Sequence, residues 1–551
     1  MNISKILSFI AAILAGLTLL CVFFPSSGIE VWGVRLEFPS LLSVLQPGSG
    51  EEDIEEETLT LTPEELLENR MASLQTRKIE EFRTFATTSP QRIYLPGGDE
   101  TYLDAFFESL EKADSQHVRI LHLGDSQLEC DRISSSLREH YQQQFGGHGV
   151  GLVPALQTVS TYTLSQTISS GDSIGHYLVY GPAAMRAPHH RYGIMGQVNR
   201  VASGTVIRLS ARDVAKYPSS GQIRCVTVMA SGSGGMTLRA GSQTQAFEAE
   251  TINESFVRYR AVLSQPADAV TISVSGTHDI YGIQLDDQCG VSLDNVPMRG
   301  CSGTIFSQID AGTLTPFFTH ENVRLLILQY GGNSVPSCSG EKGISSYMTT
   351  LRKQIRLFRR MAPEATILFI GPADMATRMG GEMKTYTILP QMVDSLREMS
   401  NQEGVAFWDM YAAMGGRGSI VRWYRANPQL AGGDFVHFTP KGAQKMADML
   451  YGTLSLYYRF YRLRMGKEGE DEMKDMQFRD AVAPVQGSSV ISVSELPPPH
   501  SGSADDEEGD VEMTAEEPEG APSSDAGQES AEPQTEKAES HAAEPGAAET
   551  E

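Results

Sequence analysis

Residues 117–126, HVRILHLGDS, contain the clearest indication of the fold in this sequence. Its largely apolar first seven residues lead into Gly124-Asp125-Ser126, and a helical candidate follows from about residue 131. Apolar runs of this length are typical of strands buried on both faces of a parallel sheet. A serine at the end of such a strand suits nucleophilic chemistry, because a tight turn holds its hydroxyl out toward a substrate.

Working outward, three more short apolar runs alternate with helical candidates. The runs lie at residues 323–329, 365–370 and 404–409, and the helical candidates at 131–145, 343–361, 389–402 and 441–464. Thr439 and Pro440 suit the N-cap and first position of the last helix. Strands that alternate with helices in this way predict an α/β fold, a three-layer parallel sheet flanked by helices.

A different pattern interrupts this alternation at residues 195–288. Segments of β-type alternation are separated there by Gly, Ser, Pro and Asn turns, which predicts an inserted β-sandwich, jelly-roll-like in kind. We therefore expect the sheet domain in two parts, residues 100–194 and 289–466.

The two ends of the chain differ from this centre. Residues 6–24 are an uncharged apolar run after Lys5, so residues 1–28 are predicted to be an export signal, favoured as an uncleaved membrane anchor over a cleaved peptide. Residues 29–99 are expected to form a stalk. Residues 467–551 are rich in Glu, Asp, Ala, Pro, Ser and Gly, and are predicted to be a disordered acidic tail.

Charge and cysteine content exclude some classes of protein. The 551 residues contain 44 Lys+Arg against 69 Asp+Glu, a formal charge of −25. This charge argues against nucleic acid as a partner, because binding a phosphate backbone needs a basic surface. Six cysteines are too few for a disulfide scaffold. No zinc signature is present, and we expect neither a metal nor an organic cofactor.

Candidates for a base and for oxyanion donors follow later in the chain. Asp434 and His437 are three residues apart, just before the last helix, a spacing that lets a carboxylate orient an imidazole. Asn333 follows the run at 323–329, where its amide could reach the same crevice. A glycine of the stretch MRGCSG, residues 298–303, offers a backbone N–H as a further donor.

The same short patterns occur elsewhere without a supporting context. Gly171-Asp172-Ser173 repeats the serine tripeptide but follows a polar stretch, so Ser173 is predicted to be a loop residue. Asp114 and His117 repeat the carboxylate and histidine spacing. His117 enters the first strand from its amino end, so a structural or surface role is favoured for it.

In chain order, Ser126 in Gly-Asp-Ser, a glycine in MRGCSG, Asn333 in Gly-Gly-Asn, and Asp434 with His437 in DFVH resemble the four blocks of the SGNH (GDSL) hydrolases. The resemblance covers about residues 115–465. It implies Ser126 as nucleophile, His437 as general base and Asp434 as the carboxylate that orients it. It also implies an oxyanion hole formed by the N–H groups of Ser126 and Gly300 and the side chain of Asn333.

The third block departs from the family pattern at Ser334, where Asp is usual. The β-rich insertion makes the chain similar to bacterial peptidoglycan O-acetylesterases in particular. The resemblance implies a serine esterase that removes O-acetyl groups from a cell-envelope glycan such as peptidoglycan. The expected location is the bacterial envelope, anchored in the inner membrane and facing the periplasm, or secreted if the apolar segment is cleaved.

Two alternatives stay open. The same residues could pass an acetyl group to a polysaccharide hydroxyl, as an O-acetyltransferase does. The chain could instead be a glycan-binding protein without turnover, although such a protein needs none of Ser126, Asp434 and His437. Acetylated polysaccharide is the expected partner in each case.

Overall fold

The computed structural model describes residues 3–25, 28–31, 34–36 and 62–496. In this part of the chain, a six-stranded sheet carries the four predicted strands and two others. Its order is β17-β4-β18-β19-β22-β3, parallel throughout except for β3 at one edge. The strands are β3 (Ile93–Tyr94), β4 (His117–Gly124), β17 (Gly290–Pro297), β18 (Val323–Gln329), β19 (Thr366–Ile370) and β22 (Ala406–Trp408).

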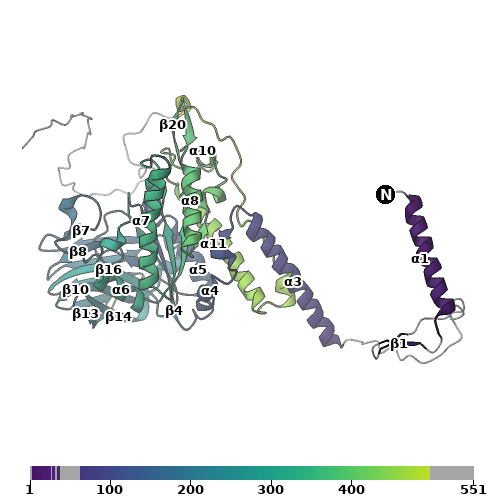
Figure 1. Cartoon of the computed structure of the whole chain (residues 1–551). Helices are drawn as coiled ribbons and strands as arrows, with labels where there is room; N and C mark the ends of the chain where they lie inside the picture. Colours follow the sequence, from purple (N-terminus) through teal and green to yellow (C-terminus); the bar gives the residue numbers. More distant parts are fainter. Residues whose placement is uncertain (1–2, 26–27, 32–33, 37–61, 497–551) are drawn as a thin grey trace, which may run out of the picture.

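Successive side chains of these strands point to opposite faces of the sheet, and a layer of helices covers each face (Figure 1). Val118 and Ile120 of β4 belong to one hydrophobic core, and Leu121 and Leu123 belong to another. The first core includes α3 (Pro63–Thr88), α4 (Asp104–Leu110), α5 (Ser134–Phe145) and α11 (Pro440–Arg464). The second includes α6 (Ala311–His320), α7 (Gly340–Met361) and α8 (Leu389–Gln402). The chain therefore has the predicted three-layer α/β fold.

Two antiparallel sheets are inserted between β4 and β17 and share one hydrophobic core. Val226 and Ile283 of one sheet are buried with Leu209 and Ile272 of the other, which makes the insertion a β-sandwich. One sheet contains β5 (Gly151–Val153), β7 (Gly175–Leu178), β8 (Gln197–Val201), β10 (Ile223–Ser233), β13 (Glu248–Asn253), β14 (Phe256–Ala267) and β16 (Thr277–Asp286). The other contains β6 (Leu164–Ser169), β9 (Val206–Ala211), β11 (Met236–Ala240), β12 (Gln243–Ala246) and β15 (Ala269–Val274).

The inserted strands begin earlier than the predicted residue 195. β6 pairs with β9, and β7 pairs with β8, although both early strands are polar and lie in a region rich in turn residues. These strands form because they pair with distant strands, and local composition does not reveal such pairing.

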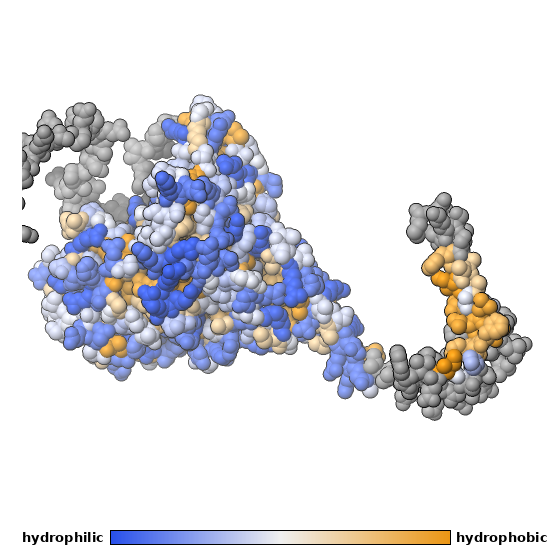
Figure 2. Space-filling model, in the orientation of Figure 1, coloured by the Kyte–Doolittle hydropathy of each residue, from blue (hydrophilic) through white to orange (hydrophobic). Residues whose placement is uncertain are grey.

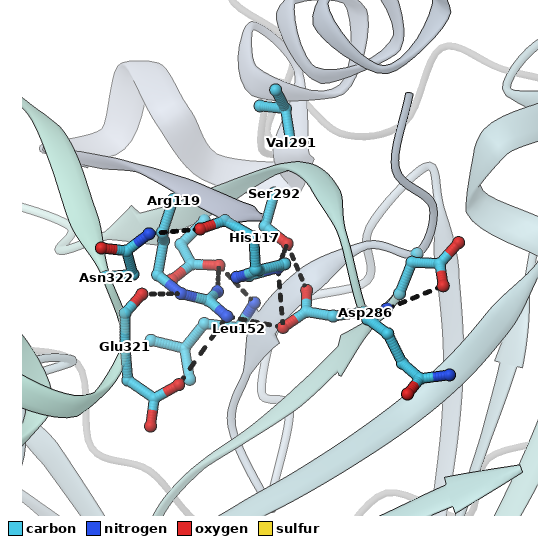
Figure 3. A network of polar contacts seen from close by, with 12 residues as sticks. His117, Arg119, Leu152, Asp286, Val291, Ser292, Glu321 and Asn322 are labelled. Atoms are coloured by element: carbon cyan, nitrogen blue, oxygen red, sulfur yellow. Dashed lines mark hydrogen bonds and ion pairs between the residues drawn. The ribbon is translucent and has the colours of Figure 1, made fainter. Parts of the chain in front are cut away.

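A buried ionic network joins the sandwich to the sheet (Figure 3). Arg119 of β4, with only 1% of its surface exposed, lies 2.6 Å from the Asp286 carboxylate of β16 and 2.7 Å from the Asp294 carboxylate of β17. Its Nε also donates to the backbone carbonyl of Glu321, whose carboxylate binds Arg258 of β14. Separating the two units would leave buried charges unpaired, so this network ties the sandwich to the strands that lead into the site.

The predicted stalk and tail both contribute to the folded domain. From Pro63 onward the stalk forms α3, which packs against α11, and then the edge strand β3. Within the predicted tail, α12 (Glu470–Asp475) packs against α3, and Ile491 is buried in the main core. The predicted end of the stalk at residue 99 and the predicted start of the tail at residue 467 were both wrong. A few apolar residues within these polar segments pack against distant helices. The remaining part of the predicted tail, 497–551, lies outside the described residues.

The apolar N-terminal segment forms α1 (Ile3–Phe23), whose hydrophobic surface Figure 2 shows. Among the residues that the structure describes, no helix has both the length and the apolarity required to cross a membrane.

Candidate active site

A cavity of about 200 Å³ opens at the carboxyl edge of the central sheet. It is lined by residues that follow β4, β18 and β19, among them Ser126, Asn333 and Pro372, and by His437 from the loop before α11. Ligands of open α/β sheets bind in such a crevice outside the carboxyl ends of the strands.

At the start of the serine turn, the space beside Gly124 is too small for a side chain. A Cβ atom at Gly124 would lie 2.7 Å from the Leu128 side chain and 3.2 Å from the Gln329 carbonyl, so glycine is needed there. Asp125 then caps the 3₁₀ turn that starts at Ser126, because its carboxylate accepts from the Gln127 N–H at 3.0 Å. The turn presents Ser126, partly exposed, to the cavity.

Ser126, His437 and Asp434 form one hydrogen-bonded chain. Ser126 Oγ lies 2.8 Å from His437 Nε2, and His437 Nδ1 lies 2.6 Å from Asp434 Oδ2. A carboxylate only accepts hydrogen bonds, so Nδ1 carries the proton and Nε2 is left to accept from the serine hydroxyl. The structure thus brings together three residues that are up to 311 positions apart in the sequence.

The Asp434 carboxylate is held by its own loop. Its Oδ1 accepts from the N–H groups of Val436 and His437, both at 3.0 Å. Burial acts to raise the pKa of Asp434, but the hydrogen bonds from His437 and Val436 outweigh it, so the pKa lies below its usual value. Asp434 is therefore ionised at neutral pH, as an orienting carboxylate must be.

Asn333 lies across the cavity from this loop and is fixed by the serine turn. Its amide donates to Asp125 Oδ2 and to the Cys301 carbonyl, both at 3.1 Å. Burial raises the pKa of Asp125 to about 6. Both amide hydrogens are thus engaged in this structure, and Asn333 would have to exchange one of these acceptors for an oxyanion.

Gly300 lies in the turn that follows β17 and is exposed. Its φ of 71° is in the left-handed region that favours glycine. The next residue, Cys301, accepts from Asn333, which places the turn beside the amide. Gly300 is not among the residues that line the cavity, so its role as a further donor stays a prediction.

Two side chains that the sequence did not mark as functional join the serine turn to the loop that carries His437. Gln127 Nε2 donates to the Val436 carbonyl at 2.6 Å, and Arg132 Nη1 donates to the Phe438 carbonyl at 3.2 Å. The serine turn and the residues after it are therefore hydrogen-bonded to the backbone on both sides of His437. No local motif marks these residues, since their partners lie about 300 positions away.

A second missed contact joins the serine turn to the turn after β17. The buried Glu129 carboxylate binds Arg299 in a bidentate pair, at 2.6 and 2.7 Å. Arg299 directly precedes Gly300, so this pair links the nucleophile candidate to the candidate oxyanion donor.

The repeated patterns lie elsewhere. Ser173 is in an exposed loop between β6 and β7, as predicted. His117 begins β4, where its ring bonds Ser292, and burial lowers its pKa to about 4. Within the described ranges, no group of three or more His, Cys, Asp or Glu is placed to hold a metal ion.

Residues 261–445 match the model of the GDSL-like lipase/acylhydrolase family. This part of the chain is similar to GDSL-type hydrolases. The match includes Gly300, Asn333, Asp434 and His437 and starts within the inserted strands, so Ser126 lies outside it. No curated protein matches the chain.

Among solved structures, the chain is similar to one described as "Peptidoglycan O-acetylesterase in action, 5 min". The identity is 21% and the TM-score 0.54, over 67% of this chain and 99% of the other. A family two carbohydrate esterase from Clostridium thermocellum, in complex with cellohexaose, matches at 11% identity and a TM-score of 0.23, over 54% of this chain and 100% of the other. The first likeness shows a common fold, and the match of residues 261–445 to the family model supports an ester hydrolase.

Proposed function

We propose that the chain is an extracytoplasmic serine esterase that removes O-acetyl groups from a cell-envelope glycan such as peptidoglycan. The observation that carries this proposal is the hydrogen-bonded chain from Ser126 through His437 to Asp434, at 2.8 and 2.6 Å, whose first two members line the cavity. A nucleophile, a base and an orienting carboxylate in this order are what acyl transfer by serine requires.

In the proposed reaction, Ser126 Oγ attacks the acetyl carbonyl while its proton moves to His437 Nε2. The Ser126 N–H, the Gly300 N–H and the Asn333 amide stabilise the negative charge on the carbonyl oxygen. The tetrahedral intermediate collapses as His437 returns the proton to the departing sugar hydroxyl. Water, activated by the same imidazole, then releases acetate and restores the serine.

The glycan substrate and the envelope location are proposed on two grounds. The similar solved structure of a peptidoglycan O-acetylesterase has the same fold over nearly its whole length. The cavity of about 200 Å³ is small for a ligand site, since drug-sized ligands occupy about 300–1,000 Å³. A small acyl group such as acetyl suits it better than a fatty acyl chain.

The test is acetate release by the full chain from O-acetylated peptidoglycan and from p-nitrophenyl acetate. Ser126→Ala should abolish release from both while leaving the melting temperature nearly unchanged. Release from the small ester alone would refute peptidoglycan as the substrate. Release that persists in Ser126→Ala would refute the assignment of the nucleophile.

A further inference from the structure

A larger cavity of about 630 Å³ lies beside the catalytic one and takes no part in the reaction described above. Four separate stretches line it: residues 90–94, one face of α8, residues 409–416 and residues 480–484 of the C-terminal segment. The volume is within the range of ligand sites, about 300–1,000 Å³.

Sheet topology places the two cavities next to each other. The catalytic cavity lies over β4, β18 and β19, and the larger one lies at the same carboxyl edge, beyond β22 and β3. Met410 lines the first cavity, while its neighbours Asp409 and Tyr411 line the second, so this segment is a shared wall. At about 4.8 Å per strand, the cavity lies about 15–20 Å along the edge from Ser126.

The walls are held in place by bonds between distant segments. Gln91 donates to the Val482 carbonyl at 2.6 Å, and the Ser89 hydroxyl bonds the Asp480 carboxylate. These contacts fix the C-terminal segment as the outer wall of the cavity, opposite α8.

The polar side chains in the cavity carry both signs of charge. Arg397 of α8 binds Asp394 at 2.6 Å and lies 3.8 Å from the carboxylate of Asp409, which is 4% exposed. Its guanidinium lies 5.1 Å from the centre of the Tyr94 ring. A planar donor flanked by two carboxylate acceptors can bond neighbouring hydroxyl groups, which both donate and accept.

The remaining lining favours the same chemistry. Tyr411 supplies an aromatic surface, and burial raises the pKa of its hydroxyl to about 12, so it stays a donor. Pro90, Pro390 and Pro484 add apolar walls. Aromatic and apolar surface beside alternating donors and acceptors suits a sugar ring, which has apolar C–H faces and a polar rim.

We propose that this cavity binds sugar residues of the same glycan strand that presents its acetyl group to Ser126. The inference rests on the proposed function, since it extends the substrate from one acetylated sugar to a strand lying along the edge of the sheet. Arg397, with Asp394, is the specificity-determining contact, and neither residue takes part in acyl transfer.

The test separates binding from chemistry. Full-length protein carrying Ser126→Ala is titrated by calorimetry with the tetramer of N-acetylglucosamine, with and without Arg397→Ala. Loss of one charge-assisted contact should weaken binding about tenfold or more. In the protein with Ser126 intact, Arg397→Ala should raise KM for O-acetylated peptidoglycan by a similar factor and leave turnover of p-nitrophenyl acetate unchanged.

Arg324→Ala is the control, because Arg324 is an arginine of similar exposure that also pairs with an exposed carboxylate, Glu364 at 3.0 Å, but at the amino end of β18. Should Arg397→Ala not fold, Asp394→Asn, whose side chain is 65% exposed, should weaken binding in the same direction. No binding of the tetramer, or equal binding with and without these changes, would overturn the inference. Binding that depends on the cavity, together with no acetate release from peptidoglycan by the parent, would refute the proposed function alone.

Discussion

The contact from Gln127 to the His437 loop gives a quantitative test of how the base is positioned. Gln127 is 8% exposed, and its Nε2 donates to the Val436 carbonyl at 2.6 Å. Gln127→Met keeps the shape and removes the donor. The lost hydrogen bond and the unpaired carbonyl should lower the free energy of unfolding by about 1–2 kcal/mol. Because His437 is the next residue after Val436, a small displacement of the ring should lower kcat by about 10–100-fold.

The assay is hydrolysis of p-nitrophenyl acetate under saturating ester, beside a thermal melt of each variant. Gln142→Met is the matched control, since Gln142 is buried and donates to the carbonyls of Gly149 and Val291, away from the cavity. It should lower stability to a similar extent and leave kcat within about twofold of the parent. Equal kcat losses in both variants, or none in Gln127→Met, would refute the positioning argument.

Three further predictions concern the oxyanion, the ionic network and pH. Asn333→Ala should lower kcat by about 10²–10³, measured on the same ester, and an unchanged kcat would remove Asn333 from the oxyanion hole. Arg119→Met should lower the free energy of unfolding by about 3–5 kcal/mol by leaving buried carboxylates unpaired, against less than about 1 kcal/mol for the exposed pair lost in Arg324→Met, measured by urea denaturation. Burial lowers the pKa of His122 to about 4, so its stabilisation is present above pH 6.5 and is lost as pH falls toward 4, where the unfolded chain binds the extra proton. His122→Asn should therefore flatten the loss of melting temperature over that range, and an unchanged slope would contradict this.

Much of the central sheet could be predicted because its strands are locally apolar. The runs at 117–123 and 323–329 became β4 and β18, and the helix predicted at 389–402 is α8. β17 was missed because Ser292, Asp294 and Asn295 interrupt it with polar residues. The structure shows why burial tolerates them: Asp294 binds Arg119, and Asn295 donates to the Leu128 carbonyl.

The sequence was enough to name candidate site residues, but not to predict the contacts that hold them in place. Gly-Asp-Ser and the spacing of Asp434 and His437 are local signals, and their partners are supplied by the fold. Gln127, Glu129 and Arg132 carry no such signal, because what they do depends on carbonyls and charges brought close only by the folded chain. Domain boundaries failed for the same reason, since Ile491 is buried by distant helices and hairpins.

Covalent labelling of the active serine would show whether Ser126 is the nucleophile. The folded full chain is treated with an organic fluorophosphonate, which reacts with activated serine hydroxyls, and the modified peptide is mapped by mass spectrometry. We expect modification at Ser126 and little or none in His437→Ala, because Nε2 would no longer accept the hydroxyl proton. Modification at another residue, or undiminished labelling of Ser126 in His437→Ala, would contradict it.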